Sequence, residues 1–187
     1  MNKIVTMKKC VCAVLIVLGF ANCAKNEDFL IARGQVGKIL STTQVHELKE
    51  LFKSDSLVSR AGEGEFADAA YDEYLIYNKA GHHLLTLIPK VQGDSTSTIE
   101  SVQIFDPNYT TVNGLGLNST YRDITDHYVV NKVEATFTTA VLFVNELNAT
   151  IAIAKKELGL KDFDPQKIVA SQIPDLAKIK TVRIWFD

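Results

Sequence analysis

The feature that most constrains the fold of this chain is an approximate repetition of three segments in the same order. The segment at residues 99–105 (IESVQIF) resembles the one at residues 179–185 (IKTVRIW). Apolar residues with helical spacing at 45–52 recur at 121–128, and a pair of alternating runs at 75–87 recurs at 141–153. The aligned residues are Val45, Leu48 and Phe52 with Tyr121, Ile124 and Tyr128; Leu75, Tyr77, Leu85 and Leu87 with Val141, Phe143, Ile151 and Ile153; and Ile99, Val102, Ile104 and Phe105 with Ile179, Val182, Ile184 and Trp185. Because the length differences between the two copies fall where the chain reads as loop, we expect a tandem duplication.

Each repeat reads as a glycine-containing lead-in, a short capped helix, a strand, a hairpin and a last strand. Serine and threonine residues at 41–43 and 119–120 are helix start signals. A unit of about 75 residues is only marginally stable alone, so we expect two repeats, at residues 29–107 and 108–187, to bury their apolar faces together. The expected fold class is α+β, with short helices on one face of a mostly antiparallel sheet or sheets. The dipeptide Asp164-Pro165 also predicts a helix that ends near residue 172.

The first 22 residues have the three parts of an export signal. Lys3, Lys8 and Lys9 form a basic region, residues 11–20 form an apolar run, and Ala21 precedes a candidate processing site. A membrane-spanning helix needs about 20 apolar residues, so this run is short for a membrane span. We therefore expect residues 1–22 to be a signal peptide, with a buried helix or an uncleaved anchor as the alternatives.

The cysteines point to the end of this signal. Cys10 and Cys12 lie inside it, and Cys23 alone follows it. Exported proteins usually pair their cysteines or have none. A lone cysteine at the end of an apolar run is explained if its thiol carries a lipid.

Residues 20–23, FANC, resemble the lipobox of bacterial lipoproteins of the Bacteroidetes type, although Phe20 and Asn22 depart from the common pattern. The resemblance implies that Cys23 is the acylated first residue of the mature chain, carrying palmitate or a similar acyl chain, and that residues 23–28 are its linker. Lys25, Glu27 and Asp28 resemble the export tag of surface lipoproteins, and an ordinary solvated linker is the alternative. The expected location is the outer membrane, facing either the periplasm or the cell surface.

The mature domain resembles two families of repeat-containing folds. The stretches VGKILSTT (residues 36–43) and GLGLNST (residues 114–120) are similar to the helix starts of β-lactamase-inhibitor-protein-like domains and of small outer-membrane assembly lipoproteins. The resemblance implies a location and a tandem fold, and it implies no catalytic residues.

Charge and motifs exclude several classes of function. Removing residues 1–22, which contain three lysines and no acidic residue, changes the formal charge from −2 to −5. An acidic domain without a basic patch argues against nucleic acid as a partner. The sequence has no zinc, serine-hydrolase or phosphate-loop motif, so we expect no metal site, no cofactor and no catalytic residue. The acidic run of Glu63, Glu65, Asp68, Asp72 and Glu73 leaves an undetected hydrolase as an alternative.

Aromatic side chains are the best candidates for a binding surface. Tyr71, Tyr74 and Tyr77 lie close together in sequence near the first hairpin, and Phe105 and Tyr109 follow the next strand. Aromatic residues anchor many protein interfaces, and half-buried packing in the sheet is the alternative. We therefore expect a non-catalytic binding or scaffold module for an unknown protein or glycan, with an inhibitor or immunity-like protein as the alternative.

Overall fold

The structure, a computed structural model, describes residues 27–60 and 72–186 and is mostly β, with few short helices and two sheets. The helical elements are η1 (Glu27–Phe29), η2 (Val45–Glu47), α1 (Leu48–Leu51), α2 (Tyr121–Thr125), η4 (Lys155–Leu158) and η5 (Ala170–Gln172). The strands are β1 (Ile31–Ala32), β2 (Gln35–Val36), β3 (Ile39–Leu40), β4 (Ser56–Arg60), β5 (Glu73–Tyr77), β6 (His83–Pro89), β7 (Ile99–Ile104), β8 (Lys132–Ala135), β9 (Thr139–Val144), β10 (Ala149–Ala154) and β11 (Ile179–Trp185). The α+β expectation therefore holds only in its coarse form, because α1 and α2 are each about one turn long.

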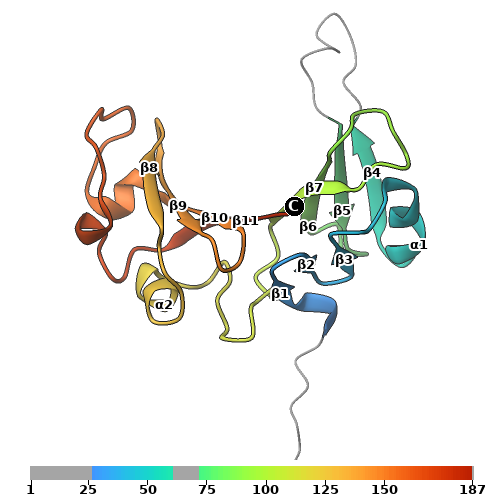
Figure 1. Ribbon diagram of the computed structural model, residues 1–187, viewed down its shortest axis with the longest axis horizontal. Coiled ribbons are helices and arrows are strands. Elements are labelled where there is room, and N and C mark those ends of the chain that lie inside the picture. The colour runs from blue at the N-terminus through green and yellow to red at the C-terminus, as the bar shows by residue number, and fades with distance from the viewer. Residues whose placement is uncertain (1–26, 61–71, 187) are drawn as a thin grey trace, which may run out of the picture.

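Eight of the strands form one antiparallel sheet in the order β4-β5-β6-β7-β11-β10-β9-β8. The last strand of each half lies at the centre, where Ile104 of β7 faces Val182 of β11. The two halves of the chain thus share a continuous sheet, and β4 and β8 are its edges (Figure 1). Strands β1–β3 form a separate small sheet.

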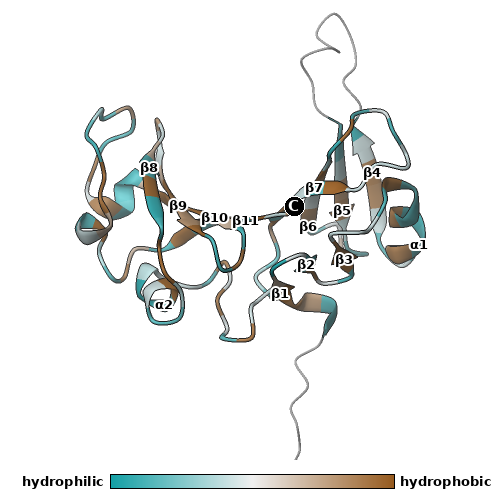
Figure 2. Ribbon diagram, viewed as in Figure 1, coloured by the Kyte–Doolittle hydropathy of each residue, from teal (hydrophilic) through white to brown (hydrophobic). Residues whose placement is uncertain are grey.

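One face of the large sheet is apolar across its whole width. The register places a single row of apolar side chains on this face, one from each strand in order: Leu57, Ile76, Leu85, Ile104, Val182, Ile151, Leu142 and Val133. Six of the eight are buried, and Leu57 and Val133, on the edge strands, pack against the same core. Hydrophobic colour accordingly concentrates in inner strands such as β6 and β7, and hydrophilic colour on the edge strand β8 (Figure 2).

The short helices and the small sheet cover this apolar face. Leu48 of α1 and Ile124 of α2 are fully buried in the core. The two helix starts are attached in the same way to the residues that precede β7 and β11. The N–H of Val45 donates to the carbonyl of Ser97 at 3.0 Å, and that of Tyr121 donates to the carbonyl of Ala177 at 2.9 Å. Each helix is thereby held beside the strand that ends its half, β7 or β11.

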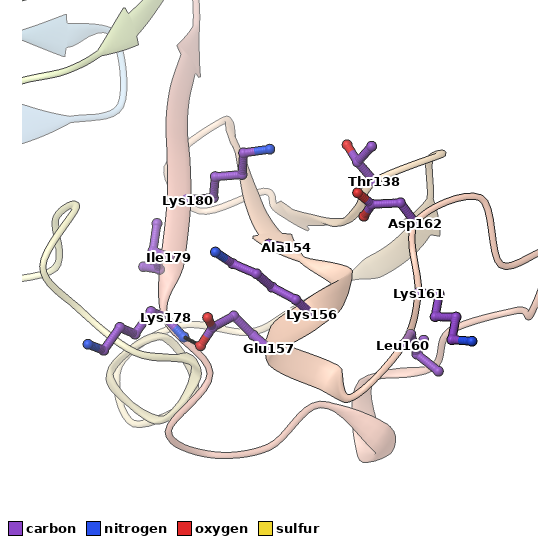
Figure 3. A pocket seen from close by; sticks show the side chains of 10 residues that line it. All are labelled: Thr138, Ala154, Lys156, Glu157, Leu160, Lys161, Asp162, Lys178, Ile179 and Lys180. Carbon is purple, nitrogen blue, oxygen red and sulfur yellow. Dashed lines mark hydrogen bonds between the residues drawn. The ribbon is translucent and has the colours of Figure 1, made fainter.

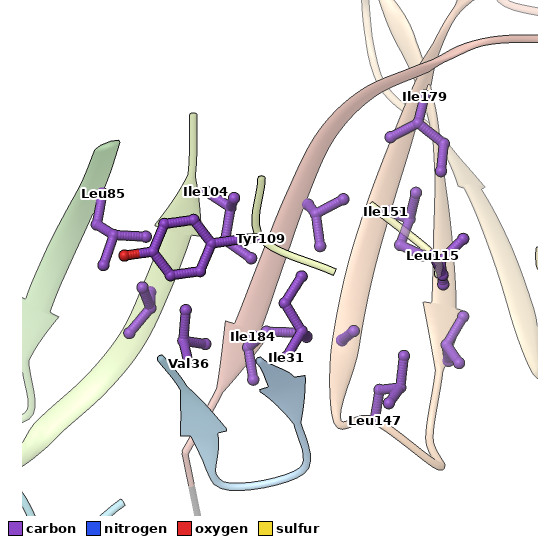
Figure 4. Close-up of a cluster of buried hydrophobic side chains, with 14 of the residues drawn as sticks. Ile31, Val36, Leu85, Ile104, Tyr109, Leu115, Leu147, Ile151, Ile179 and Ile184 are labelled. Carbon is purple, nitrogen blue, oxygen red and sulfur yellow. The ribbon is translucent and has the colours of Figure 1, made fainter. Parts of the chain in front are cut away.

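Tyr109 fills the space between the small sheet and the large sheet. Only 3% of its surface is exposed, and its ring meets that of Phe29 edge-on, with 5.1 Å between centroids. Figure 4 shows the ring among Leu85, Ile104 and Val36. The position that the sequence offered as an exposed aromatic is therefore a core position, and burial raises the pKa of its hydroxyl far above the usual value.

The helix expected from Asp164 to residue 172 does not form. The Asp164 side chain accepts a hydrogen bond from the N–H of Gln166 at 2.9 Å, so the cap is present. Residues 165–169 are irregular, however, and only η5 follows them. Ile168 and Ile173 are the buried apolar residues of the segment, and a spacing of five places them on different sides of a helix. Packing therefore favours an irregular path over a helix.

Candidate functional site

The structure separates the three tyrosines expected to form a partner face. Tyr74 lies on the apolar face of β5, where it packs against the core, and Tyr77, three residues later, lies on the opposite face. Tyr71 lies outside the described residues, as do Cys23 and Lys25. Glu27 and Asp28 begin η1. The prediction that all three tyrosines share one surface is therefore wrong for Tyr74. The candidate surface is the side of the sheet on which Tyr77 lies.

We call this side of the large sheet the open face. Figure 1 shows the sheet bent, with α1, α2 and the small sheet along the outer side of the bend. The open face lies on the inner side, where no helix of the described chain covers it. Its central side chains come from six strands and the residue after β7: Tyr77, His83, Thr86, Gln103, Phe105, Phe143, Thr150, Arg183 and Trp185.

Three aromatic rings form a column on this face. The ring of His83 stacks on Tyr77, with 4.8 Å between centroids, and on Phe105, with 3.9 Å between centroids. The imidazole Nε2 also lies 3.0 Å from the hydroxyl of Thr86 and 3.0 Å from the carbonyl of Leu85. Burial is the main cause that lowers the pKa of His83, which keeps the ring neutral near pH 7. The column is therefore apolar, fixed in position, and exposed at Phe105, which is 40% accessible.

Beside this column, at the centre of the sheet, lies a half-buried arginine. The guanidinium of Arg183 donates to Oε1 of Gln103, on the neighbouring strand, at 2.6 Å. The ring of Trp185 lies against it, with 5.6 Å between Cζ and the ring centroid. The indole N–H of Trp185 donates to the hydroxyl of Thr150 at 3.1 Å. The arrangement can hold a planar anionic or hydrogen-bonding group without rearranging its own side chains.

The sequence contains the signal for these residues. Alternation along residues 179–185 places Arg183 and Trp185 on one side of the strand and Val182 and Ile184 on the other. The apolar side of that alternation belongs to the core, and the opposite side, which includes the aligned pair Phe105 and Trp185, holds the candidate site. Side-chain parity alone also assigns Tyr74 and Tyr77 to opposite faces, since they are three residues apart.

A second candidate is a depression of about 660 Å³ near the ends of β10 and β11 (Figure 3). Its cations are Lys156, Lys161, Lys178 and Lys180, and its acidic residues are Glu157 and Asp162. The carboxylate of Glu157 accepts a hydrogen bond from the backbone N–H of Lys178 at 3.2 Å. All four lysines are exposed, so solvent and salt screen their attraction for anions. The depression can attract an anion weakly, and it offers no buried polar group to fix one.

Lys155, next to this depression, is buried for a structural reason. Only 1% of its surface is exposed, and its amine donates to the carbonyl of Asp164 at 2.6 Å. The same connector is held by the N–H of Phe163, which donates to the carbonyl of Phe137 at 2.6 Å. Lys155 therefore attaches the connector after β10 to the sheet.

Metal sites and membrane spans are two further classes of feature that bear on function. No cluster of three or more His, Cys, Asp or Glu side chains in the described part of the chain has the geometry of a metal site. None of the helices in residues 27–60 and 72–186 is long and apolar enough to cross a bilayer.

Comparison with known proteins gives one informative similarity. No protein-family model matches the chain, and no curated protein matches it. The fold is similar to the crystal structure of the uncharacterized protein yfeY from Escherichia coli, with a TM-score of 0.52 and 10% sequence identity. The match covers 83% of this chain and 99% of that one. At this identity the similarity shows the fold alone.

Proposed function

We propose that this protein is a lipid-anchored, non-catalytic binding module that presents the open face to a partner at the outer membrane. Cys23 carries the acyl anchor after removal of residues 1–22, and residues 23–28 link the anchor to the domain, with Lys25, Glu27 and Asp28 as an export tag. The domain works without a metal or cofactor. An inhibitor that covers a partner enzyme is one form of this function.

The observation that carries the proposal is the composition of the open face. The middle of this face has an exposed aromatic residue, Phe105, and, on the neighbouring strand β11, the half-buried Arg183 and Trp185. Tryptophan, tyrosine and arginine are the residues most enriched among those that dominate binding energy at protein interfaces. Their positions are fixed by stacking and hydrogen bonds within the sheet, which lowers the entropy cost of binding.

The geometry of the aromatic column favours a protein partner over a glycan. A sugar ring stacks on the free face of an aromatic ring, whereas His83 is covered on both sides by Tyr77 and Phe105. One side of Trp185 is likewise occupied by Arg183. The rings therefore offer mainly edges, together with the exposed part of Phe105, and these suit the irregular side chains of a protein.

We also propose that the domain arose by tandem duplication, with repeats at residues 29–107 and 108–187. Support comes from hydrogen bonds that recur between aligned positions of the two repeats. The N–H of Ile99 donates to the carbonyl of Thr43 at 3.3 Å, and that of Ile179 donates to the carbonyl of Ser119 at 3.1 Å. The strand order agrees with this origin. In each half, four consecutive strands lie side by side, from the edge strand (β4 or β8) to the central strand (β7 or β11).

Photo-crosslinking in living cells tests the binding function. A photo-crosslinking amino acid in place of Phe105 should give a light-dependent adduct that protease treatment removes. The matched control replaces Leu176, which is 77% exposed and lies outside the sheet, and should give no adduct. Equal labelling at the two positions, or none at Phe105, would contradict the proposal.

A further inference from the structure

Arg183 lies at the centre of the open face, and its further role rests on the proposed function of that face. It belongs to β11, between Gln103 of β7 and Thr150 of β10, in the middle of the eight-stranded sheet. A partner that fills the inner side of the bend buries its contacts most completely there. Residues at the centre of an interface contribute most of the binding energy.

The positive charge of the half-buried Arg183 guanidinium is not balanced by a nearby negative charge among the described residues. Within residues 27–60 and 72–186, no carboxylate oxygen lies within ion-pair distance of it, and its hydrogen-bond acceptor is the neutral amide of Gln103. Burial lowers the pKa of Arg183, while the more distant Glu73 and Glu100 oppose this effect. An arginine side chain stays charged near neutral pH and has five N–H donors. Most of these donors remain available to a ligand.

The surroundings also fix the direction in which the guanidinium can bind. The guanidinium carbon Cζ lies over the ring of Trp185, which is itself held by a hydrogen bond to Thr150. Gln103 holds the terminal nitrogen Nη2. A planar fork held in this way matches the two oxygens of a carboxylate, which it binds through two parallel hydrogen bonds.

We propose that Arg183 recognises a carboxylate on a protein partner, an Asp or Glu side chain that lies next to an apolar residue packed on Phe105. The two subsites lie close together, because Phe105 follows Gln103 by two residues along the chain. The mature chain has a formal charge of −5, so an acidic partner is repelled at long range. Recognition therefore depends on the short-range pair with Arg183.

The test uses two matched probes, N-acetyl-Phe-Asp-amide and N-acetyl-Phe-Asn-amide, which differ in charge and hardly in shape. They are titrated into the ¹⁵N-labelled mature chain carrying Cys23→Ser, while the side-chain N–H signals of Arg183 and Trp185 are followed by NMR. We expect saturable shifts with the Asp peptide and at least about tenfold weaker binding of the Asn peptide, since charge-assisted pairs are the stronger ones. Glucuronate, a carboxylated sugar, is the third probe.

Variants complete the test. Arg183→Gln should abolish the preference for the Asp peptide, and Lys132→Gln, which removes another cation of the same face, should leave it unchanged. If Arg183→Gln does not fold, Arg183→Lys decides, because lysine keeps the charge without the fork and should lose most of the preference. Equal binding of the two peptides, an unchanged preference in these variants, or tighter binding of glucuronate would overturn the assignment.

The outcomes separate this proposal from the proposed function. If Phe105 crosslinks in cells but the two peptides bind equally, the open face is a binding surface that does not recognise a carboxylate. If the Asp peptide is clearly preferred but Phe105 does not crosslink in cells, Arg183 is a carboxylate site and the proposed cellular function is wrong.

Discussion

Ile104 and Val182 face each other across β7 and β11, at the centre of the sheet where the two halves of the chain join. Both are almost fully buried, at 1% and 3% exposure. They are the middle pair of the apolar row that runs through all eight strands. The hydrophobic contact at this join is therefore what makes two marginal halves one stable domain.

Replacing Ile104 with Ala should destabilise the whole domain. The change removes buried methyl groups and leaves a cavity beside Val182, a loss of about 2–5 kcal/mol in the free energy of unfolding. Chemical denaturation should show a single transition at lower denaturant concentration. Leu176→Ala, at an exposed position, is the control and should change stability by about 0.5 kcal/mol or less. Two separate transitions in the wild-type protein would contradict a single cooperative core.

The sequence predicted the local elements of this fold and could not predict how they join. The spacing of residues 45–52 and of residues 121–128 predicted short helices, and alternation predicted the hairpins of β5–β6 and β9–β10. The pairing of β7 with β11 involves strands from opposite halves of the chain, and no local pattern specifies it. The burial of Tyr109 likewise depends on Gly37, which is distant in the sequence and lies against the tyrosine ring. Arg183 could have been found, because strand parity alone places it opposite the core.

Gly37→Ala should be more damaging than its small size suggests. A Cβ atom at this position would lie 2.4 Å from the carbonyl oxygen of Asp28 and 2.9 Å from the ring of Tyr109. The residue also has a positive φ of 53°, which costs an alanine about 1–2 kcal/mol by itself. Gly81 separates the two effects, because it has a φ of 80° and no atom within 4 Å of the place that a Cβ would occupy. Gly37→Ala should lower the melting temperature clearly more than Gly81→Ala, and equal effects would mean that the contact is easily relieved.

Ser101→Ala should be neutral or stabilising, although the serine is buried. Its hydroxyl, at 1% residue exposure, has no hydrogen-bond partner within the described chain. A buried polar group without a partner costs about 1–3 kcal/mol, and alanine removes this cost along with a small volume. Thr86→Val is the matched contrast, because the Thr86 hydroxyl lies 3.0 Å from Nε2 of His83, and its removal should cost about 0.5–1.5 kcal/mol. A substantial loss of stability in Ser101→Ala would indicate a bound water at this hydroxyl.

The stability of the domain should fall as the pH is lowered through the titration of His83. Burial lowers the pKa of this histidine in the folded state, so the unfolded chain binds the proton more readily. The contribution to stability is complete above the unfolded pKa of about 6.5 and is lost as the pH falls toward the lowered folded value. His83→Phe keeps a ring in the column and should flatten this part of the profile. Denaturation midpoints measured between pH 8 and about pH 5 check the slope, and identical slopes for the two proteins would refute the assignment.

Replacing Cys23 with Ala should release the protein from the membrane. If the thiol of Cys23 carries the lipid, the variant cannot be acylated, and the apolar run of residues 11–20 is too short to hold the chain stably in a bilayer, which requires about 20 residues. Cell fractionation should move the protein from the membrane to the soluble fraction, and labelling with a palmitate analogue should disappear. Cys12→Ala, within the expected signal peptide, is the matched control and should change neither result. Persistent labelling of Cys23→Ala, or loss of labelling in Cys12→Ala, would place the anchor elsewhere.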